Sequence, residues 1–379
     1  MYIRTRYLVV LLITASFACA KEVPQDSEVI KSEKTDFSIN VITDGLEHPW
    51  GMVFLPDGRM LITERPGQIR IIDKQGNLLP KPVKGMPEVK ATGQGGLLDI
   101  MLDPDFRNNK VLYFSYSAPG DGGWGTEVAR AEFVDDQLRN LKVIFRALPK
   151  SRSGHHFGSR LVIDRDGYLF ITLGERNLKE PAQDMTNHLG SVIRIKPDGS
   201  VPEDNPFVKV KDAMPENYTY GHRNMQGAAL NPWTREVWTH EHGPQGGDEI
   251  NIVKAGTNYG WPVITYGVNY GTGTKIGEGT HKEGMAQPLY YWVPSIAPSG
   301  MVFYDGDEFP EWKGDLFVGS LKFQLLVRLE IKDNKVAHEE RLLEGKLGRV
   351  RDVEVGPDGL LYVITDESNG VLAKLVPSK

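Results

Sequence analysis

The chain has 379 residues, 40% of them hydrophobic and 25% charged, which is the composition of an ordinary globular protein. This length allows either two average domains or one large all-β domain. The formal net charge of −6, with no tract rich in Lys or Arg, argues against nucleic acid as a partner.

The first 20 residues have the pattern of an export signal. Two arginines precede an apolar stretch over residues 7–18, and Ala18-Cys19-Ala20 fits a cleavage site after Ala20. The apolar run is short and charged residues follow it directly, so we expect no transmembrane segment in the mature form. The sequence therefore predicts an exported protein, periplasmic or secreted, with a lipoprotein anchored at Cys19 as the alternative. Because Cys19 is the only cysteine, cleavage after Ala20 leaves a chain without disulfides.

Residues 21–37 are charged and poor in apolar side chains, which predicts a flexible N-terminal segment. The remainder, residues 38–379, is predicted to form one domain. Within it, a turn rich in Pro, Asp, Asn or Gly repeatedly separates two runs of Val, Ile, Leu, Phe and Tyr, the pattern of a β-hairpin. The hairpins are predicted over residues 52–64, 99–117, 161–174, 228–239, 301–320 and 353–365.

The six hairpins recur at intervals of roughly 45 to 75 residues, and no stretch has a convincing long amphipathic helix. Strand repeats of this size predict an all-β fold, a six-bladed β-propeller with one hairpin in each blade. The irregular spacing leaves long loops, and we expect these loops to form a site at one end of the central channel.

The segment from His240 to Gly260 has the most unusual composition, with two histidines, three acids and five glycines. A loop rich in Gly and Pro exposes its own carbonyls, and carbonyls with carboxylates are the ligands that calcium prefers. The alternative is a polar surface turn. Other polar segments also lie next to predicted hairpins, namely residues 93–96, 153–160, 221–227 and 348–352.

Two of these segments carry side chains that suggest specific chemistry. His155 and His156 are adjacent in a Gly-rich turn and cannot both face a strand core, so at least one is expected to face solvent or a ligand. Arg349 and Arg351 alternate and therefore lie on one face of an extended segment. They require an anion, such as a ligand with carboxylates, or a salt bridge to Asp or Glu elsewhere. Gathered at one channel mouth, these segments suit a flat anionic cofactor.

Taken in order, these segments carry motifs that span most of residues 38–375. The chain resembles the soluble aldose sugar dehydrogenases of the glucose/sorbosone dehydrogenase family, which depend on pyrroloquinoline quinone (PQQ). The matching motifs are Gly93-Gln-Gly-Gly-Leu-Leu-Asp99, His156-Phe-Gly-Ser-Arg-Leu161, Tyr220-Gly-His-Arg-Asn-Met-Gln-Gly227, Glu241-His-Gly-Pro-Gln-Gly-Gly-Asp-Glu-Ile-Asn251, Asn258-Tyr-Gly-Trp-Pro262, Ser320-Leu-Lys322 and Arg349-Val-Arg-Asp352. The resemblance also implies a six-bladed propeller.

The resemblance implies roles for individual side chains. His156 corresponds to the catalytic base, and Gln94 and Arg223 complete the implied catalytic group. Gln94 also lies beside the cofactor and the substrate. The groups implied to hold the PQQ carboxylates and quinone oxygens are Arg223, Asn224, Lys322, Arg349 and Arg351.

The resemblance also implies two calcium ions. The carbonyls of Gly243 and Pro244 correspond to ligands of the cofactor's calcium. Glu249 and the main chain of Tyr259 correspond to ligands of a second, structural calcium. One departure concerns the residue before the base, which is His155 here where the family usually has Asp or Asn; a charged His155 would oppose protonation of His156.

The expected reaction is oxidation of an aldose at its anomeric carbon to a lactone. A neutral imidazole removes the hydroxyl proton, the C–H gives a hydride to PQQ, and the electrons pass to an external acceptor. The expected protein is a monomer or homodimer. Two alternatives remain open: a calcium-dependent lactonase on a similar propeller, which has no need of paired arginines and a lysine, and a non-enzymatic propeller that serves as a binding module.

Overall fold

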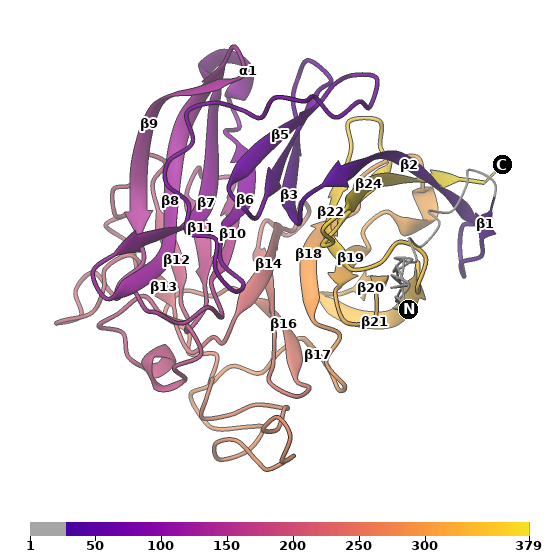
Figure 1. Ribbon diagram of the computed structural model, residues 1–379. Coiled ribbons are helices and arrows are strands. Elements are labelled where there is room, and N and C mark those ends of the chain that lie inside the picture. The colour runs from indigo at the N-terminus through magenta and orange to yellow at the C-terminus, as the bar shows by residue number, and fades with distance from the viewer. Residues whose placement is uncertain (1–27, 379) are drawn as a thin grey trace, which may run out of the picture.

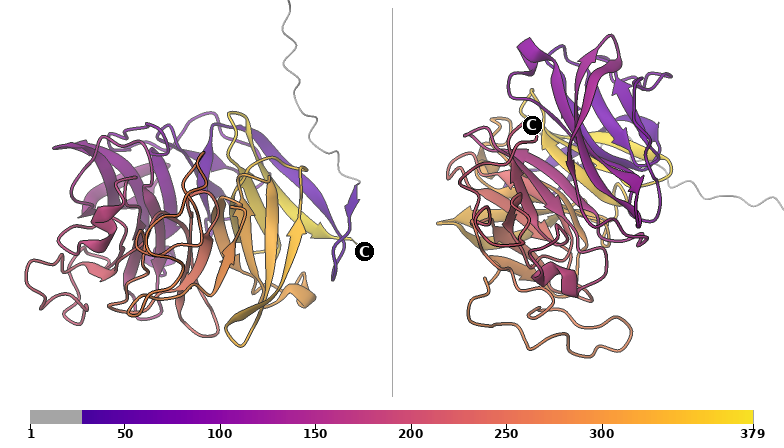
Figure 2. Two further views of the ribbon diagram at one scale, coloured as in Figure 1. Left: turned by 90° about the horizontal axis from the view of Figure 1, so that it is seen from below. Right: turned by 90° about the vertical axis from the view of Figure 1, so that its left-hand side faces the viewer.

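Six antiparallel β-sheets arranged in a ring form the body of the protein (Figures 1 and 2). The coordinates are a computed structural model that describes residues 28–378. The predicted signal peptide, its cleavage site and Cys19 lie outside the described residues. Within residues 28–378, no helix has the length and apolar character needed to cross a membrane.

The sheets are numbered here as blades 1 to 6 in chain order. Blade 1 contains β3 (Pro49–Phe54), β4 (Met60–Glu64) and β5 (Gln68–Ile72). Blade 2 contains β6 (Leu97–Leu102), β7 (Val111–Gly120), β8 (Gly123–Val134) and β9 (Gln137–Arg146). Blade 3 contains β10 (Gly158–Ile163), β11 (Leu169–Leu173), β12 (Val192–Ile195) and β13 (Asn217–Thr219).

Blade 4 contains β14 (Met225–Leu230), β15 (Val237–Glu241), β16 (Asp248–Ile252) and β17 (Tyr290–Trp292). Blade 5 contains β18 (Pro298–Phe303), β19 (Leu316–Ser320), β20 (Leu325–Lys332) and β21 (Lys335–Leu342). Blade 6 contains β22 (Val350–Val355), β23 (Leu361–Thr365), β24 (Gly370–Pro377), β2 (Phe37–Leu46) and β1 (Val29–Ile30). The helices of the described chain are short: α1 (Phe106–Asn109), η1 (Glu180–Gln183) and η2 (Pro310–Trp312).

The six predicted hairpins are the first two strands of the six blades, which confirms the predicted six-bladed propeller. Each of these strand pairs is antiparallel, from β3 with β4 in blade 1 to β22 with β23 in blade 6. In blade 1 the turn Pro56-Asp57-Gly58 lies between the strands, and Gly58 has a φ of 88°, a conformation that glycine adopts without strain.

The first strand of each blade lies innermost, and these strands contact one another around the whole ring. The contacts run from β3 through β6, β10, β14 and β18 to β22, and β22 contacts β3 again. The ring is also closed at its edge, because β2 from the N-terminal part pairs with β24 from the C-terminal end; the two lie side by side in Figure 1. This pairing removes an exposed sheet edge and ties the two ends of the domain together.

The hydrophobic core lies between neighbouring sheets. One cluster joins blades 1 and 2 and another joins blades 2 and 3, so a central strand is covered on both faces. All five residues of β4 are buried, for example, and the same holds for β11 and β23. Strands covered on both faces read as continuous apolar runs, which is why the sequence showed runs rather than alternation.

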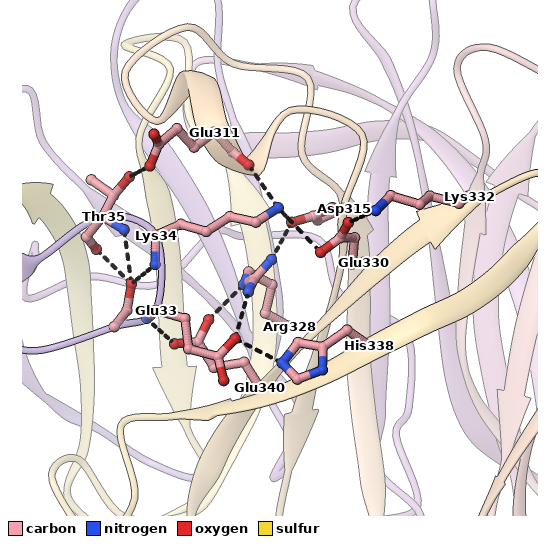
Figure 3. Close-up of polar contacts among 11 residues, drawn as sticks. Glu33, Lys34, Thr35, Glu311, Asp315, Arg328, Glu330, Lys332, His338 and Glu340 are labelled. Carbon is pink, nitrogen blue, oxygen red and sulfur yellow. Dashed lines mark hydrogen bonds and ion pairs between the residues drawn. The ribbon is translucent and has the colours of Figure 1, made fainter.

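A short segment that precedes β2 packs against blade 5 through a network of charges (Figure 3). Arg328 is fully buried there and donates to Asp315 (2.6 Å) and Glu340 (2.7 Å). Glu33 lies 3.6 Å from the same guanidinium, and the Lys34 ammonium lies 3.4 Å from Glu330. The sequence predicted a flexible segment through residue 37. Its described part, residues 28–37, is instead held in place by these ion pairs and by the pairing of β1 with β2.

Candidate functional site

A cleft of about 730 Å³ opens at the end of the ring where the innermost strands begin. Of the residues singled out from the sequence, the cleft lining includes Gln94, Pro244, Lys322, Arg349 and Arg351. The charged side chains of the lining are Arg65, Lys322, Arg349, Arg351 and Asp366. Four cations thus face one carboxylate, and the cleft carries a surplus of three positive charges.

The two arginines of the 348–352 segment share one acidic partner. Arg351 donates to Asp366 at 2.7 Å and to Gln226 at 2.9 Å, whereas the Arg349 guanidinium lies 3.5 Å from the same carboxylate. Burial alone would raise the pKa of Asp366, but the attraction of Arg351 outweighs it and holds the pKa well below its usual range. The salt bridge considered as an alternative is therefore present. It satisfies only part of the pair, because Nε of Arg351 is buried without a partner.

His156 lies beside the cleft on the turn that leads into β10. It is not among the lining residues, but its backbone N–H donates to Oε1 of Gln94, which lines the cleft, at 2.8 Å. The imidazole is only 7% exposed, and its Nδ1 lies 2.6 Å from Oε1 of Glu175. An ionised Glu175 accepts a hydrogen bond from Nδ1–H, so Nε2 is the ring nitrogen left to accept a proton from a substrate.

The electrostatic surroundings keep this pair in the states that a base requires. Burial lowers the pKa of His156 below its ordinary value, and the hydrogen bond that Nδ1–H donates to Glu175 opposes that shift. Arg223 and His155 lower the pKa further, and the effect of His155 has the sign expected from the sequence. Burial would raise the pKa of Glu175, but its hydrogen bond with His156 holds the pKa below the ordinary value. A neutral imidazole beside a carboxylate is the resulting state near pH 7.

The backbone of the His156 turn is held in a conformation that side chains seldom adopt. His156 has a φ of 53°, in the left-handed region. Arg176 fixes the preceding residues by donating to the carbonyls of His155 (2.9 Å) and Ser153. It also ties the turn to β8 by donating to the Trp124 carbonyl (2.8 Å). On the other side, a Cβ at Gly174 would lie 2.2 Å from the His156 carbonyl oxygen, so only glycine allows this approach. Such constrained backbone is frequent at functional sites.

Arg223 and Asn224 lie behind the His156 turn. The Arg223 guanidinium donates to the carbonyls of His242 (3.0 Å) and Gly243 (2.7 Å), and Asn224 Oδ1 accepts from the Gly158 N–H (3.1 Å). Nε of Arg223 and Nδ2 of Asn224 are buried donors without a partner. Unpaired buried donors are costly, so these two atoms indicate an acceptor that the protein alone does not supply.

A second, small cavity of about 10 Å³ adjoins the cleft, since His242 lines both. Its lining includes four residues named from the sequence: Arg223, Gly243, Glu249 and Tyr259. Burial, and next the nearby Glu241, raise the pKa of Glu249 well above its ordinary value. The carboxylate of Glu249 accepts a long hydrogen bond from the Asn251 amide, at 3.5 Å. A poorly paired carboxylate on a cavity about the size of one water or ion is a fitting place for a cation.

The turn from Gly243 to Gly247 concentrates carbonyl oxygens. A Cβ at Gly243 would lie 2.2 Å from the Gly246 oxygen and 2.3 Å from the Gly247 oxygen, so these carbonyls crowd against residue 243. The carbonyls of Gly243 and Pro244 each accept one hydrogen bond, from Arg223 and from the Tyr270 hydroxyl, respectively. Each retains a second lone pair for a metal ion. Within the described residues, no group of three or more His, Cys, Asp or Glu side chains could hold a metal.

Several residues of the site were not predicted from the sequence. Glu175 follows β11 and Asp366 follows β23, and each pairs with a functional side chain. Both are acids that come shortly after the second strand of an Asp-Gly hairpin, and aligning the hairpins would have found them. Trp50 and Arg65 line the cleft but carry no motif of their own. His240, by contrast, is fully buried with a pKa lowered to about 3 by burial, and is part of the structure rather than of the site.

The six-bladed ring identifies the chain as a β-propeller protein, and a cationic cleft lies at one end of its ring. Residues 46–374 match the Glucose / Sorbosone dehydrogenase family, and the chain belongs to that family. It is 47% identical to the aldose sugar dehydrogenase YliI of Escherichia coli (strain K12), covering 90% of this chain and 93% of that protein. It is 28% identical to quinoprotein glucose dehydrogenase B of Acinetobacter calcoaceticus, covering 95% and 91%, respectively.

Solved structures show the same relationship. The apo form of the soluble aldose sugar dehydrogenase from Escherichia coli has a TM-score of 0.87 and 45% identity, covering 90% of this chain and all of that one. The PQQ-bound form of the aldose sugar dehydrogenase from Streptomyces coelicolor has a TM-score of 0.73 and 27% identity, covering 89% and 98%.

Proposed function

We propose that this protein oxidises aldose sugars at the anomeric carbon to lactones, with PQQ and calcium as cofactors and an external electron acceptor. The observation that carries the proposal is the pairing of a buried His156–Glu175 base with a cleft whose walls hold three surplus positive charges. Oxidation with an anionic quinone requires a general base next to a site that binds a polyanion.

The residues present fit PQQ, a planar tricarboxylate. Lys322, Arg349 and Arg351 would hold its carboxylates, since the cleft cations outnumber Asp366 and Nε of Arg351 lacks a partner. The buried donors of Arg223 and Asn224 would meet further oxygens of the cofactor. The carbonyls of Gly243 and Pro244 would hold its calcium, and Glu249 with the main chain of Tyr259 would hold a second ion at the small cavity.

The protein's part in the reaction is to hold charges and move one proton. His156 accepts the proton of the anomeric hydroxyl at Nε2, and Glu175 stabilises the imidazolium that forms. Gln94 fixes the backbone of the base through its hydrogen bond to the His156 N–H. When bound, PQQ would be the acceptor of the two electrons that leave the anomeric C–H bond. The implied localisation, periplasmic or secreted, follows from the N-terminal pattern and remains part of the proposal.

Reconstitution tests the function against its alternatives. Protein purified without cofactor should reduce an artificial electron-accepting dye with aldoses only after both PQQ and calcium are added. A lactonase would instead hydrolyse lactones with calcium alone, and a binding module would show neither activity. Lactone hydrolysis without dye reduction would contradict the proposal.

Arg351→Ala should weaken PQQ binding by about ten- to a hundredfold, because a charge-assisted contact in a buried site contributes about 1.5–3 kcal/mol. The binding is measured by titrating the apo protein with PQQ and following the quenching of tryptophan fluorescence. Arg165→Ala, which removes an exposed arginine outside the cleft lining, is the matched control. An unchanged titration curve for Arg351→Ala, with the fold intact, would refute its role in binding PQQ.

A further inference from the structure

The lining of the cleft is chemically divided. Its charged side chains belong to blade 6 or to residues that adjoin strands of blades 5, 6 and 1, such as Lys322 after β19 and Arg65 after β4. The side that blade 4 and its loops contribute carries apolar groups instead, namely the half-buried Val268 and the exposed Tyr270 and Val293. A polyanion would bind at the cationic side of the cleft, which leaves the apolar side for an uncharged ligand.

Val268 and Tyr270 lie on the loop over residues 253–289, between β16 and β17, which projects at the bottom of Figure 1, whereas Val293 follows β17. The loop returns to the cleft at Val268, which exchanges backbone hydrogen bonds with Gln245 at 3.1 and 3.3 Å. A Cβ at Gly267 would lie 2.3 Å from the Gly246 carbonyl oxygen, so glycine permits this close contact. The loop is therefore fixed to the turn that carries the carbonyls of Gly243 and Pro244.

Tyr270 lies two residues after Val268, in this fixed part of the loop, and is 66% exposed. Its hydroxyl donates to the Pro244 carbonyl at 2.8 Å, which orients the side chain while most of its surface remains open. The hydroxyl of such a tyrosine is already hydrogen-bonded, whereas the face of its ring is apolar, so packing an apolar surface against that face is favourable. The C–H groups on one face of a pyranose ring provide an apolar surface of matching shape, whereas the sugar hydroxyls can still reach polar groups of the cleft.

We propose that Tyr270 is a specificity-determining residue that packs its ring against the C–H face of a pyranose substrate, with its hydroxyl remaining on Pro244. This inference rests on the proposed sugar oxidation, because it names the wall against which that sugar binds. It predicts that loss of the ring weakens sugar binding without weakening the binding of PQQ.

The kinetic test uses the holoenzyme with PQQ and calcium. Tyr270→Ala should raise KM for a hexopyranose at least about tenfold, the loss of roughly one aromatic contact, with little change in kcat. Tyr270→Phe keeps the ring and should remain within about threefold of the wild type in KM. Trp233→Ala is the control, since it removes another exposed aromatic ring (51%) outside the cleft lining and should leave KM unchanged.

A binding measurement provides a readout that does not depend on turnover. In PQQ-loaded protein carrying His156→Ala, sugar binding is measured by calorimetry with and without Tyr270→Ala. The second substitution should weaken sugar binding about tenfold, while the PQQ titration of the Tyr270→Ala protein stays at the wild-type value.

Two results would overturn the inference: unchanged sugar affinity in Tyr270→Ala, or a loss of PQQ affinity that accounts for the whole kinetic effect. In the second case Tyr270 would only support the Pro244 carbonyl. Failure of the proposed function would be distinct, because the wild-type holoenzyme itself would then oxidise no aldose.

Discussion

His156→Ala should reduce turnover at least about a hundredfold while PQQ still binds, because a positioned general base contributes about 10²–10⁴ in rate. The reason lies in the contacts of the ring, whose Nδ1 is engaged by Glu175 so that Nε2 is left for the substrate. Steady-state kinetics on the reconstituted protein measure the loss, and a PQQ titration shows that the cofactor is retained.

The neighbouring histidine is the matched control for this prediction. His155 is exposed and its ring lies 6.1 Å from that of His156, so His155→Asn should change turnover far less. Equal losses from the two substitutions would contradict the assignment of His156 as the base.

The pH dependence provides a second check on the base. A base acts in its deprotonated form, so activity is lost as pH falls through its pKa. Because burial lowers the pKa of His156 below its ordinary value of 6.5, the acid limb of kcat/KM should lie below pH 6.5. His155→Asn removes a neighbour that lowers this pKa, so the limb should move to higher pH. A limb that moves in the opposite direction would contradict this account of the site.

Removal of calcium should abolish activity and also lower the melting temperature of the apo protein by a few degrees. An ion present at about 100 times its Kd adds about 2.7 kcal/mol to the free energy of unfolding, because it binds only the folded state. The described chain offers the ion a poorly paired carboxylate, Glu249, beside Glu241 on a cavity of about 10 Å³. Scanning calorimetry with and without a chelator measures the shift.

Glu249→Ala isolates the structural ion from the ion assigned to the cofactor. Its melting temperature should match that of the chelated wild type and should no longer respond to the chelator. Glu283→Ala, which removes an exposed acid from the loop over residues 253–289, should keep the full response. If the chelator leaves the wild-type melting temperature unmoved, no structural calcium exists and Glu249 is only a half-buried acid.

The fold could be predicted from the sequence because its repeating unit is local. A turn such as Pro56-Asp57-Gly58 between two apolar runs specifies a hairpin without any long-range information, and the six hairpins mark the six blades. The pairing of β2 with β24 joins residues more than 300 positions apart, roughly the length of the whole domain. No local sequence pattern predicts such a pairing. The packing of residues 28–37 against blade 5 depends in the same way on distant partners such as Arg328.

The candidate site was partly predictable for a related reason. Unusual loops pointed to His156, Arg351 and the carbonyl-rich turn, since the chemistry of those residue types is visible in the sequence. Their partners were overlooked: Glu175 and Asp366 share a position just after the second strand of a hairpin, but only the ring brings these acids to His156 and Arg351. Tyr270 gave no signal either, since only the return of its loop to Gln245 places it on the cleft.

We propose that this cleft holds PQQ and that a bound sugar transfers two electrons to the cofactor. The most direct measurement mixes PQQ-loaded, calcium-loaded protein with an aldose in the absence of oxygen and dye, and records the absorbance of the cofactor. We expect one equivalent of sugar to reduce the bound PQQ completely and to yield a lactone. The reduction should be slower when the anomeric C–H is deuterated. A cofactor spectrum that stays oxidised in the presence of every aldose would contradict it.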